Sequence, residues 1–264
     1  MSDELLHDLK DGLLTLTMNR PERRNAFTPD MVTKMRDLLA SAAHDPAVRA
    51  VMVTGAGGHF CAGGDVKAMN EGAGLDLTYG EHKHRLRDRM NVSAYLHDMP
   101  KPTIAAIDGA AAGAGLSVAL ACDIRICATD SKITTAFAKV GLSGDFGGTY
   151  FLTKMLGAAR ARELYLTSPV LSGTEAAALG LVSRAVDPGT VQDTARDLAQ
   201  SLANGPTLTL GRIKQNIAMA ESGASLAECL DHEAANHMAS TITNDHQEAA
   251  AAFVEKRKPR FTAS

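Results

Sequence analysis

The chain has 264 residues, 45% of them hydrophobic, and a formal net charge of -3. This length and composition are enough for one large hydrophobic core or for two smaller ones. Because the chain is slightly acidic, with only short basic clusters at 20–24 and 256–260, neither nucleic acid nor an anionic membrane is expected as a partner.

Cysteine usage and the N-terminus bear on the compartment. The four cysteines are Cys61, Cys122, Cys127 and Cys229, and no two of them form a C-x-x-C pair. This pattern favours buried free thiols in a reducing compartment, and no metal site is expected. The start of the chain is acidic, and no apolar run reaches the roughly 18 residues that span a bilayer. We therefore expect a cytoplasmic protein.

Strand-like runs alternate with helical patterns through the first two thirds of the chain. Strands are expected at 13–18, 49–54, 103–107, 123–128 and 181–186. Helices are expected from Pro29, capped by Thr28, and over 81–97 and 149–166. Glycine-containing loops are expected over 72–80 and 137–148.

Helical patterns dominate from Thr174 onward. Strand and helix alternation followed by helices predicts an α/β core and a helical end region. The break is expected near 200, at Ala203-Asn204-Gly205-Pro206, which divides the chain into 1–200 and 201–264.

Two turns of small residues are the most informative local feature. One is His59-Phe60-Cys61-Ala62-Gly63-Gly64-Asp65, and the other runs from Asp108 to Ser117. Residues without bulk let a ligand approach backbone amides, and amides at a helix start attract negative charge. Two such donors aimed at one carbonyl oxygen would form an oxyanion hole. The alternative is that both turns only permit close packing of helix on sheet.

Four stretches in order resemble the crotonase (enoyl-CoA hydratase/isomerase) superfamily. They are Asn19 to Ala26, Phe60 to Lys67, Gly113 to Ile124, and Ala252 to Pro259. The resemblance implies a spiral core of β-β-α turns over 1–200, which binds acyl-CoA, and a C-terminal helical trimerisation region. It also implies a homotrimer or a dimer of trimers. No cofactor is expected, because coenzyme A is part of the substrate.

The resemblance also implies the roles of individual residues. The amides of Ala62 and Ala114 are expected to hold the thioester oxygen. Asp65 is expected to bond backbone amides of its own loop. Contacts with CoA or substrate are expected from Arg24, Ala26, Ala62, Gly63, Gly64, Asp65, Ala114, Phe137, Phe253 and Lys256. Lys256 would meet a CoA phosphate from a neighbouring subunit, or it is simply a solvated residue of a basic tail.

The catalytic base separates this sequence from hydratases of the superfamily, which use two glutamates. Ser117 and Phe137 stand at the two matching positions, and neither is a carboxylate. Asp145 lies in a stretch that resembles the loop of family isomerases that places an aspartate over the substrate. One carboxylate fits the movement of a double bond better than the addition of water, which needs two coordinated groups.

Two interpretations of Asp145 stay open at this stage. As a base, it would need burial beside Phe137 or Phe146 to raise its pKa from about 3.9. As an alternative, it would cap the helix expected to follow it. His82 and His84 are two residues apart and face different sides of a helix, so a joint metal site is not expected, and the sequence does not show a role for either.

The sequence thus predicts an enzyme that stabilises a CoA-thioester enolate and shifts a double bond in an enoyl-CoA. An enoyl-CoA hydratase or an acyl-CoA hydrolase is the first alternative. A non-catalytic acyl-CoA-binding protein is the second. The acyl group itself cannot be read from the sequence.

Overall fold

The computed structural model describes residues 3–67 and 77–264. Within them, the main sheet has the strand order β1-β2-β3-β4-β6-β9, and a smaller sheet has the order β5-β7-β8. In the main sheet only β1 and β2 pair in antiparallel fashion. The strands are β1 Leu5–Lys10, β2 Leu13–Met18, β3 Ala50–Gly55, β4 Thr103–Ile107, β5 Ala110–Ala112, β6 Ile124–Ala128, β7 Lys132–Thr134, β8 Leu171–Ser172 and β9 Arg184–Val186.

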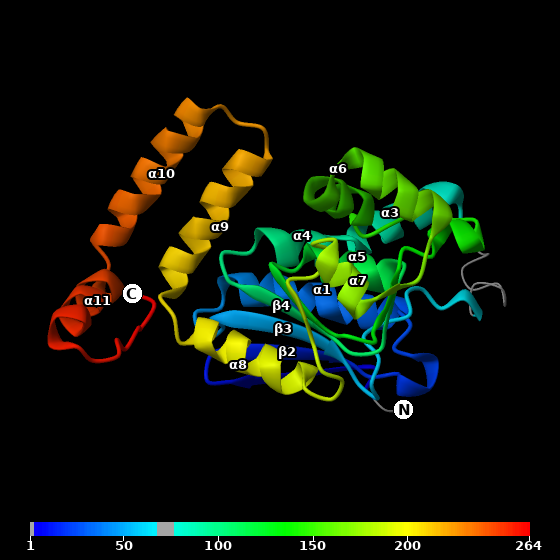
Figure 1. Cartoon of the computed structure of the whole chain (residues 1–264), viewed down its shortest axis with the longest axis horizontal. Helices are drawn as coiled ribbons and strands as arrows, with labels where there is room; N and C mark the ends of the chain where they lie inside the picture. The colour runs from blue at the N-terminus through cyan, green and yellow to red at the C-terminus, as the bar shows by residue number, and fades with distance from the viewer. Residues whose placement is uncertain (1–2, 68–76) are drawn as a thin grey trace.

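Helices cover both faces of the main sheet. The α-helices of the described residues are α1 Pro29–His44, α3 Tyr79–Arg89, α4 Asn91–Asp98, α5 Ala114–Ala121, α6 Gly148–Thr167, α7 Gly173–Ala178, α8 Val191–Ala203, α9 Thr207–Glu221, α10 Leu226–Thr241 and α11 Asn244–Glu255. Two short 3-10 helices are η1 Pro21–Arg23 and η2 Phe137–Val140. In Figure 1, α8 runs along one side of the sheet, and α4 and α5 lie on the other.

The central strands are buried on both faces, so their residues alternate between two cores. In β3, Val51 and Val53 belong to the larger core, together with side chains of α1, α4 and α5. Ala50 and Met52 belong to the smaller core under α8. This two-residue period explains why the parallel strands read as nearly continuous apolar runs.

Most expected elements are present, with local differences. Strands β2 and β4 match their predicted bounds, and Thr28 caps α1 as expected. The helix expected over 81–97 is broken at Met90 into α3 and α4. Of the loop expected over 72–80, residues 72–76 lie outside the described residues, whereas Tyr79 and Gly80 already belong to α3.

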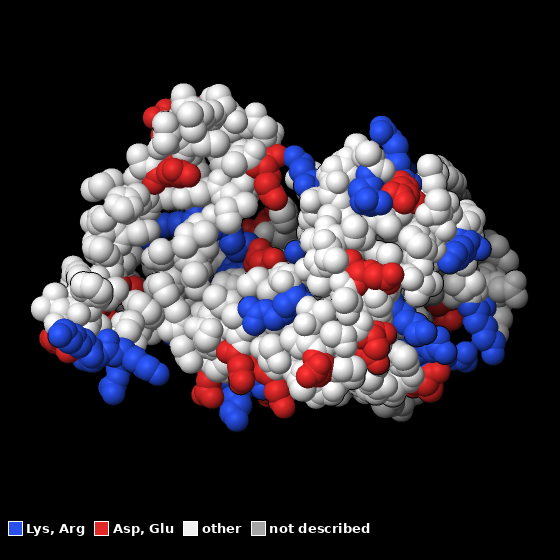
Figure 2. All heavy atoms as spheres, in the orientation of Figure 1, with Lys and Arg blue, Asp and Glu red and all other residues white. Residues whose placement is uncertain are grey.

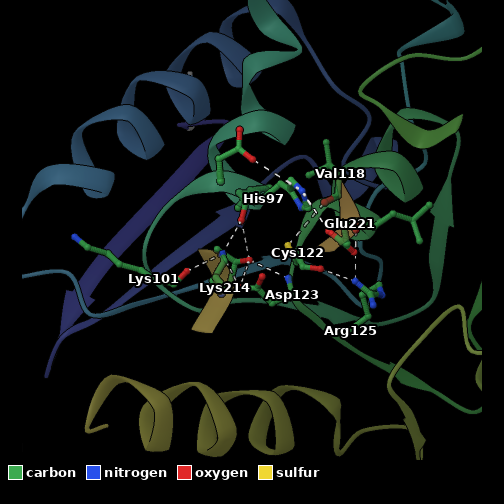
Figure 3. Close-up of polar contacts among 12 residues, drawn as sticks. His97, Lys101, Val118, Cys122, Asp123, Arg125, Lys214 and Glu221 are labelled. Atoms are coloured by element: carbon green, nitrogen blue, oxygen red, sulfur yellow. Dashed lines mark hydrogen bonds and ion pairs between the residues drawn. The ribbon is translucent and has the colours of Figure 1, made fainter. Parts of the chain in front are cut away.

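Helices α9, α10 and α11 extend away from the sheet (Figure 1). One attachment of α9 to the core is Lys214, whose Nζ lies 2.8 Å from Oδ2 of Asp123 and donates to the carbonyl of Lys101 at 3.0 Å. Asp123 also accepts hydrogen bonds from the amide and hydroxyl of Thr103 in β4. Figure 3 shows this cluster between α9 and the sheet. The division near 200 stays a prediction, and the chain passes from α8 to α9 at residues 204–206.

Surface features are mixed. On the face shown in Figure 2, acidic and basic side chains are interspersed rather than gathered into a field of one sign.

Among the described residues, no helix combines the length and the apolar character that crossing a bilayer requires. Cys61, Cys122 and Cys127 are buried and all four cysteines are free, which confirms the prediction of buried free thiols for three of the four.

Candidate active site

Two backbone hydrogen bonds hold the small-residue turns together. The amide of Cys61 donates to the carbonyl of Ala110, and the amide of Ala112 donates to the carbonyl of Cys61, both at 2.9 Å. The first turn follows β3 and the second follows β4, which are neighbouring parallel strands. The sheet therefore delivers both turns to the same edge, and the bridge fixes them side by side.

Glycines in the turns allow the close approach. Gly63 has φ of +95°, and a Cβ there would lie 2.9 Å from the Ala112 carbonyl oxygen and 3.5 Å from the Ala114 amide nitrogen. A Cβ at Gly115 would lie 2.5 Å from the Cys61 carbonyl oxygen. Side chains at these positions would push the turns apart or cover the Ala114 amide. The turns do pack tightly, and this packing also leaves an amide exposed to a ligand.

The amide of Ala62 is already occupied, so the prediction that it donates to a thioester oxygen is wrong. It donates to the carbonyl of Arg24 at 2.9 Å. Gly64, two residues later, lines the main pocket together with Ala114. Among the described residues, neither the Gly64 amide nor the Ala114 amide has a hydrogen-bond acceptor. Ala114 is the first residue of α5, where helix geometry leaves the amide without an internal partner.

The pocket has a volume of about 870 Å³. Its walls come from the two turns, from the segment after η2, and from helices α1 and α3. Asp145 lines it together with Gly64 and Ala114. Apolar side chains supply much of the remaining wall: Phe27, Val32, Leu77, Leu86 and Phe146.

The surroundings of the Asp145 carboxyl group suit a proton acceptor that works near neutral pH. Its Oδ1 is buried and has no hydrogen-bond partner among the described residues. Burial raises the pKa of Asp145 to about 6. The neighbouring Phe146 is buried and packs against Phe27, with ring centroids 5.7 Å apart. The sequence-based expectation of a raised pKa is thereby confirmed.

The capping interpretation of Asp145 is wrong. Helix α6 begins at Gly148, its cap residue is Gly147, and no side chain caps it. Asp145 contributes only its backbone carbonyl, which accepts from the Gly148 amide at 3.1 Å. Its carboxylate is therefore left for the pocket.

Behind Asp145 lies a buried aromatic and hydroxyl cluster. Phe137 stacks on Tyr165 with centroids 5.9 Å apart, and it is not among the residues that line the pocket. Its expected contact with substrate is thus absent from this pocket. Cβ atoms built on Gly144 and Gly148 would lie 3.2 Å from the ring and 2.5 Å from the hydroxyl of Tyr165. Tyr165 therefore supports the turn that carries Asp145.

The other position that matches a family glutamate is equally unsuited to proton transfer. The hydroxyl of Ser117 donates to the carbonyl of Gly113 at 3.2 Å within α5. Ser117 is buried and does not line the pocket. Burial raises the pKa of Tyr165 to about 12, opposed by a hydrogen bond with Ser117 and reinforced by the charge of Asp145. Of the carboxylates that line the pocket, Asp65 beside Gly64 pairs with Arg20, whereas Oδ1 of Asp145 has no hydrogen-bond partner among the described residues.

Two organising residues were missed in the sequence, although both lie in the Asn19 to Ala26 motif. Arg20 donates to the Ala26 carbonyl at 2.7 Å and pairs with Asp65 at 3.1 Å. The buried Asn25 donates to the carbonyls of Ala56 and His59 at 2.9 and 2.7 Å. Arg20 is thus one partner of the Asp65 carboxylate, and the expected bonds from amides of its own loop stay a prediction. The motif fastens the first turn.

The expected CoA contacts fall in different places. Ala26 is buried beside the turn, and Arg24 lines a second hollow of about 660 Å³ together with Lys132. Phe253 and Lys256 lie at the end of α11, which Figure 1 places far from α3, so the structure does not bring them to the pocket of their own chain.

The two histidines of α3 also separate. His82 lines the main pocket, and His84 does not. This agrees with the expectation that residues two apart on a helix face different sides.

An αβ fold with two free amides and a partly buried carboxylate in one pocket defines the class of the protein, and comparison with known proteins identifies the family. A family model described as "Enoyl-CoA hydratase/isomerase" matches residues 8–264. The chain belongs to this family, within the crotonase superfamily.

Relatives with assigned names carry out different reactions. The chain is 39% identical to the 1,2-epoxyphenylacetyl-CoA isomerase of Escherichia coli, with 99% of each chain covered. It is 30% identical to the trans-2-decenoyl-[acyl-carrier-protein] isomerase of Streptococcus mutans, with 98% of each covered. A solved enoyl-CoA hydratase from Polaromonas sp. JS666 superposes with a TM-score of 0.90 at 32% identity, covering 97% of this chain and 99% of that one.

Proposed function

We propose that this protein is an isomerase that moves a double bond in an enoyl-CoA, with Asp145 as the single base. The observation that carries the proposal is the buried, unpaired Oδ1 of Asp145 in the same pocket as Gly64 and Ala114. In this assignment the Gly64 amide has the role that was expected of the Ala62 amide. The amides of Gly64 and Ala114 hold the thioester oxygen.

The reaction needs one proton acceptor and one oxyanion site. The Asp145 carboxylate removes a proton from the carbon next to the thioester of a 3-enoyl-CoA. The electron pair moves onto the thioester oxygen, where the two amides stabilise the negative charge of the dienolate. Asp145 then delivers a proton to the fourth carbon, and the double bond moves into conjugation with the thioester. The reaction consumes no water and uses no second carboxylate.

Coenzyme A meets positive charge near the first turn. Arg24 and Lys132 line the same hollow, and both carry side chains suited to a phosphate. The resemblance adds Phe253 and Lys256, which in this assignment reach the CoA of a neighbouring copy.

The test offers a 3-enoyl-CoA and follows the conjugated product by absorbance, with Asp145→Asn as the variant. We expect a loss of about 100- to 10,000-fold in kcat, the usual contribution of a positioned acid or base. Wild-type kcat should rise with pH through about 6 and then level off, because only the carboxylate accepts a proton. Unchanged turnover in Asp145→Asn would reject the proposal.

Two further measurements separate the alternatives. Oxygen from labelled water in the product indicates a hydratase or hydrolase, since isomerisation incorporates none. A binding protein without catalysis would bind the thioester but would not exchange its carbon-bound protons with solvent. The proposed isomerase exchanges such protons and incorporates no oxygen.

A further inference from the structure

Three arginines line the pocket at a distance from the two amides. Arg36 comes from α1, and Arg85 and Arg89 come from α3. Phe27 forms a bridge with Gly64, so the start of α1 lies beside the first turn. Arg36 follows Pro29 by seven residues, or about 10 Å along the axis at roughly 1.5 Å per residue. Arg36 therefore lies about two helical turns from the thioester end, and its ion pair with Asp88 brings α3 to the same part of the pocket.

The arginine wall contains two arginines, Arg85 and Arg89, that form no ion pair with a carboxylate among the described residues. Its carboxylates are Asp88, which forms an ion pair with Arg36, and Asp30 at the start of α1. Arg89 donates through Nε to the carbonyl of Arg85 at 3.1 Å, a backbone group rather than a carboxylate. Arg36 also forms an ion pair with Asp37 at 2.7 Å, so two carboxylates compensate Arg36, while Arg85 and Arg89 remain the guanidinium groups available to a further anion.

Arg85 and Arg89 stand four residues apart, so they lie on one side of α3 and repel each other. Arg85 is exposed and Arg89 is half-buried. Burial lowers the pKa of Arg89, the charge of Arg85 lowers it further, and the charge of Asp88 raises it. An anion between the two guanidinium groups would offset this repulsion. It would also supply acceptors for the terminal nitrogens of Arg89, which make no hydrogen bond among the described residues.

We infer that the pocket takes acyl-CoA thioesters whose acyl chain ends in a carboxylate, which binds to Arg85 and Arg89. The inference rests on the proposed function and names its substrate class. A guanidinium matches a carboxylate in planar, two-point geometry and forms charge-assisted hydrogen bonds. Val32, Leu86 and Phe146 line the same pocket and suit the apolar part of such a chain.

The CoA phosphates are the other anions that these arginines could hold, and the experiment distinguishes the two. Three probes are titrated into the whole protein by calorimetry: adipoyl-CoA, hexanoyl-CoA and free CoA. The first two are saturated six-carbon thioesters that differ only in a terminal carboxylate or methyl group. Because neither can isomerise, their binding is independent of catalysis.

The variants are Arg85→Gln and Arg89→Gln, with Arg87→Gln as the matched control. Arg87 lies on the same helix, but its guanidinium donates to Oδ1 of Asn91 at 2.6 Å and it does not line the pocket. We expect the wild type to bind adipoyl-CoA at least tenfold more tightly than hexanoyl-CoA, since a hydrogen bond to a charged group contributes about 1.5–3 kcal/mol. Each pocket variant should lower this ratio about tenfold, and Arg87→Gln should leave it unchanged.

Equal wild-type affinity for the two acyl thioesters would overturn the inference. An equal loss of affinity for all three probes in the pocket variants would assign the arginines to CoA instead. Hexanoyl-CoA affinity reports whether each variant keeps a folded pocket. If the affinity ratio is as expected but a 3-enoyl-CoA does not react, only the isomerase proposal fails. If a 3-enoyl-CoA reacts but the two acyl thioesters bind equally well, only the inference of a terminal carboxylate fails.

Discussion

A carboxyl group with a buried, unpaired oxygen costs stability, and Asp145 carries this cost at the point where the pocket meets the two amides. Neighbouring elements enforce the arrangement. Tyr165 packs against Gly144 and Gly148 on either side of Asp145, and Phe146 is buried next to it. Such a group persists where function gains more than stability loses.

The pH dependence of stability follows from this burial. The pKa of Asp145 is about 6 in the folded protein against an ordinary value of 3.8, so its contribution to stability is largest below pH 4 and is lost as pH rises through 6. Asp145→Asn should therefore be more stable than the wild type at pH 8, by about 1–2 kcal/mol after allowance for solvent screening. The two proteins should be nearly equal at pH 3.5. Urea unfolding at both pH values measures the difference.

A matched control for this prediction is Asp197→Asn, on the exposed face of α8. It should change stability by the same small amount at both pH values. If Asp145→Asn behaves like this control, the carboxyl group is solvated in solution and the burial argument fails.

At the residue scale, the sequence identified a turn that lines the pocket but not which of its amides is free. Which amide of a turn is free depends on the other backbone groups that reach it. The Arg24 carbonyl takes the Ala62 amide from 38 positions away in the chain. Spacing within Phe60 to Lys67 cannot reveal this contact. Asp145 was identified because its stretch resembles the loop of family isomerases that carries an aspartate, while Ser117 and Phe137 stand at the two glutamate positions.

At the element scale, buried parallel strands could be predicted because both of their faces are apolar, as in β2 and β4. Edge strand β1 was not predicted, since five of its six residues are exposed and carry no core pattern. The predicted helix over 149–166 contains a break at Gly157, where φ is 75° and ψ is 160°. Tertiary contacts, rather than local pattern, decide such features.

The attachment of α9 to the core gives a prediction for this scale. Lys214→Ala removes the ion pair with Asp123 and the donor to the Lys101 carbonyl. Because both side chains are largely buried, we expect a loss of about 1–3 kcal/mol in the free energy of unfolding. Hydrogen exchange should accelerate in α9 while β3 and β4 stay protected.

Lys258→Ala, in the exposed tail, is the control and should leave both unfolding and exchange unchanged. A Lys214→Ala protein with wild-type exchange in α9 would show that the ion pair does not hold this helix to the sheet.

At the scale of the whole molecule, the C-terminal helices present apolar side chains without a partner in the described chain. Ile242 is 79% exposed and Phe253 is 85% exposed. Exposed apolar surface of this kind marks an association surface. The resemblance to the family adds the expectation of a homotrimer or a dimer of trimers, which stays a proposal.

Light scattering tests the assembly. We expect a mass of three or six times the 27.8 kDa of the chain. Ile242→Glu and Phe253→Glu place charge in the proposed interface and should shift the mass toward that of one chain. The exposed Arg160→Glu on α6 is the control and should leave the mass unchanged. A wild-type protein with the mass of a single chain would contradict the proposal.

The most direct test of the account removes one backbone donor and leaves the side chains of the pocket in place. Ala114→Pro deletes the amide at the first position of α5, where helices tolerate proline, and Ala114→Gly keeps it. With a 3-enoyl-CoA, we expect kcat to fall about 100- to 1000-fold in Ala114→Pro. Ala114→Gly should retain most of its activity, and both variants should unfold at temperatures close to that of the wild type. Wild-type turnover in a folded Ala114→Pro protein would contradict the claim that paired amides stabilise the enolate.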